Sequence, residues 1–184
     1  LCCCVAFAIG QEFKRNTFAD WVNPQQIVSS FLGKILVYVC IFCFWTWSWM
    51  FWLAHIRGYF IAGSLSLILI AQFLLYFAYA VISSTVVLAT KDLPKTFGFI
   101  ALYGGSSPSF SGITPPLNNA PAFTQFWSMI IPYTPYAKLQ TEQWVIGSDL
   151  WVSLLPFCIL IIFSALYFAL SIHLLRKNTL EQRS

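Results

Sequence analysis

Long apolar runs separated by short polar segments dominate the chain, and this pattern predicts membrane-spanning helices. Residues 35–56 contain no Asp, Glu, Lys or Arg and, at about 1.5 Å per residue, can cross a hydrocarbon core of about 30 Å. A strand is not expected here, because an open strand in lipid would leave backbone groups unpaired. The predicted fold is therefore an all-α, polytopic membrane bundle with spans at residues 34–56, 60–89, 96–113 and 150–174.

Two of these spans contain residues that disturb a helix. Residues 96–113 contain the run GGSSPSFSG, which is expected to break or kink the helix. Pro156 predicts a kink about two turns into the last span. Residues 1–10, LCCCVAFAIG, are too short to cross a bilayer. We therefore expect them to end a span that begins upstream, so that the sequence is an N-terminally truncated, C-terminal portion of a larger protein.

Residues 11–30 interrupt the apolar pattern. Within residues 11–24, QEFKRNTFADWVNP, a helical period of about 100° per residue separates two arcs. One arc is aromatic: Phe13, Phe18 and Trp21. The opposite arc is mostly polar: Glu12, Arg15, Asn16, Asp20 and Asn23. A short helix lying flat on the membrane surface and ended by Pro24 fits this pattern, and a solvated loop between two spans is the alternative.

Residues 114–149 are rich in proline and contain no run long enough to cross a bilayer. Their apolar piece, residues 122–131, is about half the length of a span, which is typical of interfacial or re-entrant helices. Aromatic residues suited to a membrane interface accompany it: Trp127, Tyr133, Tyr136 and Trp144. The chain then ends in a polar tail at residues 175–184.

Composition supports a membrane protein, and the placement of charge predicts its orientation. The chain is 59% hydrophobic and only 9% charged, whereas soluble domains carry about 25% charged residues. If residues 11–30 are cytoplasmic and the spans alternate, only Arg57 and Lys138 among the 10 basic residues face outward. Such an excess on one side is the positive-inside signal, so residues 114–149 are expected outside and the tail inside.

The sequence offers few groups for metal or nucleotide chemistry. The 6 cysteines lie in apolar runs, where Cys behaves as a small hydrophobe. Cys40 and Cys43 share a helix face, but no acidic residue or histidine lies near them to complete a metal site. No G-x-x-x-x-G-K-[ST] motif occurs. We therefore expect no metal, no disulfide framework and no ATP bound by this chain.

Other kinds of membrane function would need groups that are scarce here. An ion-coupled carrier normally uses an intramembrane carboxylate, but the strongest polar group in the spans is Gln72. A channel would need charged rings or a carbonyl filter, which only the GGSSPS run could imitate. A membrane-embedded enzyme acting on a lipid would need acids or bases near the interface. Glu142 and Asp149 are the only carboxylates expected outside, and we expect both to be solvated.

The order of several landmarks resembles the type-2 ABC exporter permeases, in particular the C-terminal membrane region of the bacterial drug-efflux branch. The cytoplasmic landmarks match in order: Glu12, Thr17, Trp21, Pro24, Gly33 and Lys34. Asn16 stands where that family usually has Gly, and Trp21 where it usually has Leu. The later landmarks also match in order: Phe110, Ser111, Gly112, Pro115, Pro121, Trp127, Pro132 and the QTEQ segment at residues 140–143.

This resemblance implies a permease half that pairs with a second half, identical or different, and with two ABC ATPase subunits that bind ATP and Mg²⁺. The residues implied to couple to the ATPase are Glu12, Phe13, Arg15, Thr17, Phe18, Trp21 and Pro24. The residues implied to form an extracytoplasmic gate of re-entrant helices are Gly112, Pro115, Pro121, Trp127 and Pro132.

The resemblance also implies export of an apolar or amphipathic substrate across the bacterial cytoplasmic membrane. It leaves room for a periplasmic adaptor and gives no reason to expect a nucleic-acid partner. The missing upstream part would supply the first span, an extracytoplasmic domain and half of the second span.

Overall fold

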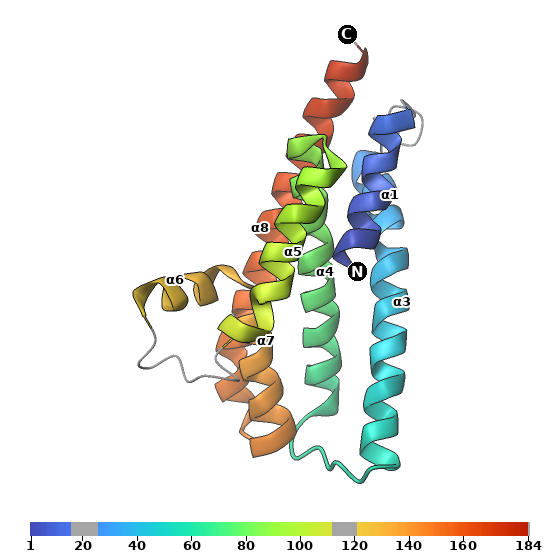
Figure 1. The fold of residues 1–184 in the computed structure, drawn as a ribbon. Coiled ribbons are helices and arrows are strands. Elements are labelled where there is room, and N and C mark those ends of the chain that lie inside the picture. Colours follow the sequence, from blue (N-terminus) through green and yellow to red (C-terminus); the bar gives the residue numbers. More distant parts are fainter. Residues whose placement is uncertain (16–25, 112–120, 184) are drawn as a thin grey trace.

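The computed structural model describes residues 1–15, 26–111 and 121–183, and the regular structure in these ranges is helical (Figure 1). The elements in chain order are α1 (Cys2–Arg15), α3 (Ile27–His55), α4 (Leu65–Thr90), α5 (Leu93–Phe110), α6 (Ala122–Ile130), α7 (Tyr133–Gln140), the π-helix η3 (Thr141–Ile146) and α8 (Leu150–Arg183). The all-α class predicted from the sequence is confirmed for these residues.

Three of the described helices are long and apolar enough to cross a membrane, namely α3, α4 and the part of α8 from Leu150 to Leu180. They coincide with three of the four expected spans. α5 is not among the three, because Pro94 and Lys95 lie in its first turn and small and polar residues fill its second half. The expected span at residues 96–113 therefore stays a prediction.

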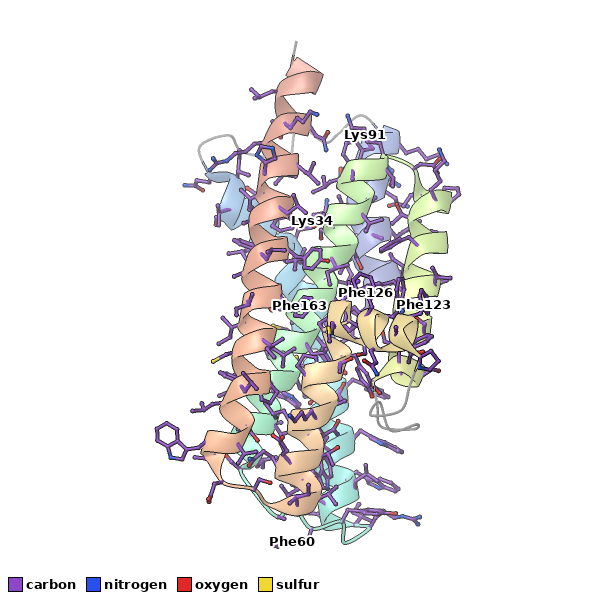
Figure 2. All side chains as sticks on the ribbon, turned by 90° about the vertical axis from the view of Figure 1, so that its left-hand side faces the viewer. Lys34, Phe60, Lys91, Phe123, Phe126 and Phe163 are labelled. Atoms are coloured by element: carbon purple, nitrogen blue, oxygen red, sulfur yellow. The ribbon has the colours of Figure 1, made fainter. Side chains whose placement is uncertain are left out.

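The chain passes up and down the bundle so that several helix ends meet at one end (Figure 1). In that view α1, α4 and α8 run upward and α3 runs downward, whereas α5, α6 and α7 descend in steps. Basic residues lie near these helix ends along the chain: Lys14 and Arg15 end α1, Lys34 lies near the start of α3, Lys91 follows α4, Lys95 is in the first turn of α5, and Arg176 and Lys177 lie near the end of α8. Figure 2 labels Lys34 and Lys91 in the upper half of the molecule. The predicted clustering of basic residues is present, and its assignment to the cytoplasm stays a prediction.

Two helix boundaries differ from those expected from the sequence. α1 continues without interruption to Arg15, so residues 11–15 extend an upright helix instead of opening a separate one. α3 begins at Ile27, well before the expected boundary at residue 34. The reason is packing, because Phe31 and Ile35 are both fully buried in the core and continue the apolar face of α3 upstream.

α4 lies at the centre of the bundle and packs against α1, α3, α5 and α8. Small buried residues allow close approach of the neighbouring helices: Ala71, Ala78, Ala80, Ser83 and Ser84. Thr85 Oγ1 lies 2.7 Å from Ser171 Oγ on α8, and Asn178 Nδ2 donates to the Leu88 carbonyl at 2.9 Å. These polar contacts fix the register of α8 against α4 inside an otherwise apolar interface.

α5 does not break where the sequence predicted. Asp92 caps its start by accepting a hydrogen bond from the Lys95 N–H at 3.3 Å. The helix then continues through the glycine pair and Pro108 to Phe110. It ends about half-way along the bundle, where α6 lies across the molecule and α7 resumes the descent (Figure 1). This step places α5, α6 and α7 around one region beside α4.

Candidate functional site

A cavity of about 660 Å³ lies among α1, α4, α5 and α7. Gly104 and Gly105, the pair expected to disrupt α5, line this cavity instead. A Cβ atom at either position would meet no other heavy atom within 4 Å, so the glycines leave open space on this face of α5. The weakly apolar half of α5 therefore forms a wall of the cavity.

Tyrosine rings and uncharged polar groups dominate the polar part of this lining: Gln72, Tyr76, Tyr79, Tyr133, Tyr136 and Gln140. Within the described residues, no Asp, Glu, Lys or Arg side chain lines the cavity. An unpaired ion in such a place would lose its hydration without gaining a counter-charge. No group of three or more potential metal ligands occurs in the described ranges either. The lining suits an uncharged molecule with apolar and hydrogen-bonding parts.

Gln72 gives this cavity an unusual polar group. The residue is only 4% exposed, and its Oε1 has no hydrogen-bond partner among the described residues. A buried acceptor without a partner costs about 1–3 kcal/mol. This oxygen is closed to solvent where it stands, so a ligand that donates a hydrogen bond would recover the cost only after the Gln72 amide turns toward the cavity. The sequence identified Gln72 as the strongest polar group of the spans, and the structure places it in the wall of the cavity.

Two buried tyrosines connect the cavity to α6. The Tyr79 hydroxyl donates to Ser107 Oγ at 2.6 Å, and the Tyr79 ring meets the Tyr103 ring edge-on with centroids 6.3 Å apart. The Tyr103 hydroxyl donates at 2.7 Å to the carbonyl of Ile130, the last residue of α6. A continuous series of side-chain contacts therefore runs from the cavity wall on α4, through α5, to the end of α6.

Trp127 holds α6 against α5 from the other side. Its Nε1 donates to Ser106 Oγ at 3.2 Å, and its ring meets the Tyr103 ring edge-on at a centroid distance of 6.3 Å. α6 also carries exposed apolar side chains at Phe123, Phe126 and Met129; Phe123 stacks on the Trp127 ring at a centroid distance of 5.9 Å, and Figure 2 labels the two phenylalanines. α6 is thus an amphipathic helix attached to the bundle along one side.

The predicted gate residues fall into two groups. Trp127 lies in α6, Pro121 immediately precedes α6, and Pro132 immediately precedes α7. The structure therefore brings these three to the two short helices beside the cavity. Gly112 and Pro115 lie outside the described residues. A re-entrant path and a gating role stay predictions.

A polar network around the buried Gln143, which we call the polar clasp, ties the α3–α4 connection to η3 and α8. Its members are Gly63, Ser64, Glu142, Gln143, Ser148 and Ser153. Gln143 Oε1 accepts from the Ser64 N–H at 2.9 Å, and Gln143 Nε2 donates to Ser153 Oγ at 2.9 Å. The Gln143 carbonyl accepts from the Gly63 N–H at 2.8 Å. Of these residues, the sequence indicated only Glu142, as a carboxylate expected to be solvated, and the QTEQ segment through the resemblance.

The expectation that Glu142 is solvated is wrong. The residue is 7% exposed, and its Oε2 accepts a hydrogen bond from Ser153 Oγ at 2.8 Å. Lys138 Nζ lies 4.0 Å from the other carboxylate oxygen. Because these partners occupy the carboxylate and Glu142 does not line the cavity, the structure gives no support to this residue as a catalytic acid of a lipid-modifying enzyme.

The predicted coupling residues are only partly visible. Glu12, Phe13 and Arg15 lie at the C-terminal end of α1, whereas Thr17, Phe18, Trp21 and Pro24 lie outside the described residues. Glu12 Oε1 forms an ion pair with Lys34 Nζ of α3 at 2.5 Å, and the two side chains are only 23% and 20% exposed. Phe13 packs against the core, and Arg15 is exposed. Glu12 therefore joins α1 to α3.

Comparison with known proteins identifies the family of this chain. A family model described as ABC-2 family transporter protein matches residues 12–173. The chain belongs to this family. The resemblance inferred from the order of landmarks is confirmed at the level of the ABC-2 family. No curated protein and no solved structure matches the chain.

As an ABC-2 permease, the chain is a membrane component of an ABC transporter and not its ATP-hydrolysing subunit. The family implies an ATPase partner and a membrane-bound complex. The three long apolar helices agree with an integral membrane protein.

Proposed function

We propose that this ABC-2 permease is one half of an ATP-driven exporter that moves uncharged apolar or amphipathic molecules outward across a bacterial cytoplasmic membrane. It would pair with a second permease half, identical or different, and with two ATPase subunits that bind ATP and Mg²⁺. The observation that carries this proposal is the cavity of about 660 Å³ inside an ABC-2 bundle, lined by tyrosines and amides without a charged side chain.

The coupling route follows from the ends of α1 and α3. The Glu12–Lys34 ion pair joins these helices where the chain enters and leaves the region that the sequence predicts to dock on the ATPase. A displacement imposed there would therefore pass into α1 and α3 together. α1 packs against α4 and α5 and contributes to the cavity wall. We infer that this connection carries the work of ATP hydrolysis to the cavity.

The outer end of the pathway would be closed by α6 and α7. α6 is short and amphipathic, and it lies across the bundle at the level where α5 ends (Figure 1). α6 packs on α5 through Trp127, and α7 lines the cavity with Tyr133 and Tyr136. Movement of this pair of helices would open or close the outer side of the cavity, which is the role that the resemblance implies for Pro121, Trp127 and Pro132.

Transport in vesicles tests the proposed function. The permease, its second half and its ATPase would be reconstituted together, and uptake of the uncharged dye N-phenyl-1-naphthylamine would be followed by fluorescence in inside-out vesicles. Uptake should require ATP, and it should stop when the P-loop lysine of the ATPase is replaced. Uptake driven by an ion gradient without ATP would support the carrier alternative, and chemical conversion of a lipid would support the enzyme alternative. Either result would overturn the proposal.

A further inference from the structure

The contacts between the cavity and α6 suggest how the two parts communicate. Tyr79 lines the cavity, but Tyr103 does not. Tyr103 nevertheless contacts the ring of Tyr79 on one side and both Trp127 and the Ile130 carbonyl of α6 on the other. It is therefore positioned between a residue that a ligand can touch and the helix that the ligand must pass.

We propose that Tyr103 is a positioning residue that transmits occupancy of the cavity from Tyr79 to α6, so that a bound uncharged ligand releases the outer helix. This inference rests on the proposed function, because it assigns a role to the same cavity and the same outer helices. It goes beyond that function by naming the residues through which the ligand controls α6.

The geometry supports a mechanical link. The Tyr79 hydroxyl is bonded to Ser107 at 2.6 Å, and Ser107 also lines the cavity. A ligand that hydrogen-bonds to either hydroxyl competes with this bond and displaces the Tyr79 ring. The edge-on contact between Tyr79 and Tyr103 passes the displacement to the Tyr103 ring. Tyr103 is buried, so its ring cannot move without changing its contact with Trp127 or its bond to Ile130.

The attachment of α6 depends on a small number of polar contacts. Two of the described hydrogen bonds connect α5 with α6. Tyr103 of α5 donates to the Ile130 carbonyl of α6, and Trp127 of α6 donates to Ser106 of α5. The Tyr103 ring lies against the Trp127 ring that makes the second bond. Movement of Tyr103 therefore loosens both. Phe126 and Met129 of α6 are exposed and add no described contact that holds the helix to the bundle.

Three phenylalanine substitutions separate this link from a general loss of tyrosine hydroxyls. Tyr103→Phe removes the bond to α6 outside the cavity, and Tyr79→Phe removes the bond to Ser107 at the cavity wall. Tyr38→Phe is the control. Tyr38 lies on α3 and packs against the core, but it does not line the cavity.

The experiment measures two quantities: binding of the dye, and the distance between α6 and the bundle. Spin labels at Phe126→Cys on α6 and Ile162→Cys on α8, both exposed positions, would report the distance between α6 and the bundle by pulsed electron paramagnetic resonance. The labelled permease would carry no other cysteine and would be held in lipid nanodiscs. Fluorescence of N-phenyl-1-naphthylamine in the unlabelled protein would report binding. Both would be measured for the parent and for each variant.

In the parent, we expect the dye to bind and to shift the distance distribution. Tyr103→Phe should bind the dye with a Kd within about threefold of the parent value, but it should lose the dye-induced shift of the distance distribution. Tyr79→Phe should reduce the shift, and Tyr38→Phe should keep it. A parental shift in Tyr103→Phe, or an equal loss of the shift in Tyr38→Phe, would overturn the link. Dye binding without any shift in the parent overturns the link and leaves the proposed cavity intact. Absence of dye binding overturns both.

Discussion

At the scale of single residues, one buried amide connects three parts of the permease. The amide and carbonyl groups of Gln143 bond to the α3–α4 connection and to the start of α8 at the same time. Gln143 has no exposed surface, so its bonds cannot be replaced by water when the side chain is altered. The polar clasp therefore depends on one side chain.

Replacing Gln143 tests this dependence. Gln143→Leu keeps a similar volume but removes the side-chain partner of the Ser64 N–H and of the Ser148 carbonyl, whereas Ser153 keeps its bond to Glu142. Each buried group left without a partner costs about 1–3 kcal/mol, so we expect a clear loss of stability in detergent unfolding experiments. Gln26→Leu, at an exposed position before α3, is the control and should unfold like the parent. Equal stability of the two variants would show that the clasp contributes little.

Glu12 and Arg15 lie in the same last turn of α1, and we expect Glu12 to stabilise the fold and Arg15 to contact the ATPase. Glu12→Gln should weaken the junction of α1 and α3, because a hydrogen bond to a charged group contributes about 1.5–3 kcal/mol and this pair is largely covered. Arg15→Gln, at an exposed position in the same last turn, should change stability by less than about 1 kcal/mol. We expect Arg15→Gln to impair stimulation of the ATPase by substrate if this end of α1 docks on it.

Thermal unfolding and substrate-stimulated ATPase activity of the assembled transporter would be measured for both variants. Normal stimulation with Arg15→Gln would contradict its docking role. Unchanged stability of Glu12→Gln would contradict the structural role of the ion pair.

At the scale of helices, the sequence predicted which segments are apolar better than where they begin and end. The apolar pattern predicted the three long helices, because a long apolar segment in lipid must form its backbone hydrogen bonds within itself. It placed the start of α3 too late, because Gly33 and Lys34 look like a boundary until Phe31 is seen to be buried. The glycine-rich run predicted a break or a kink in α5, but the helix is unbroken and Gly104 and Gly105 face open space in the cavity.

Glycine substitutions test how tightly the helices pack. Gly10 lies inside α1, where an added Cβ would overlap the Leu93 side chain of α5. Gly33 lies inside α3, where an added Cβ would meet nothing within 4 Å. Gly33→Ala should therefore stabilise the permease by up to about 1 kcal/mol. Gly10→Ala should destabilise it, because overpacking typically costs about 1–3 kcal/mol.

Unfolding midpoints of these two alanine variants provide the measurement. A gain in stability for Gly10→Ala would mean that α1 and α5 do not approach as closely as the structure places them.

At the scale of the whole molecule, the candidate site arises from contacts that the sequence cannot specify. Gln72 was identifiable as an isolated polar residue in an apolar span. The cavity, however, requires α1, α4, α5 and α7 to meet, and Tyr103 becomes important only because it lies between Tyr79 and Trp127. Burial of Glu142 likewise follows from its position against Ser153 of α8, eleven positions further along the chain.

The orientation of the bundle is a prediction at this scale. Single cysteines would replace Phe60, which is 85% exposed after α3, and Lys95, whose side chain is 75% exposed at the start of α5. Lys91 lies just before the start of α5, and Figure 2 shows Phe60 and Lys91 at opposite ends of the molecule. In whole cells, a membrane-impermeant maleimide should label the cysteine at position 60 and not the one at position 95. The reverse pattern would invert the predicted topology.

The uncharged lining of the cavity also has an electrical consequence. Moving one elementary charge through a membrane potential of 100 mV changes its energy by about 2.3 kcal/mol. A neutral cargo carried past side chains without charge moves no net charge through that field. The proposed exporter should then work at the same rate in energised and depolarised vesicles, and clamping the potential with valinomycin and potassium should leave ATP-driven dye transport unchanged. Cells that lose their membrane potential would keep this route of export for as long as ATP remains.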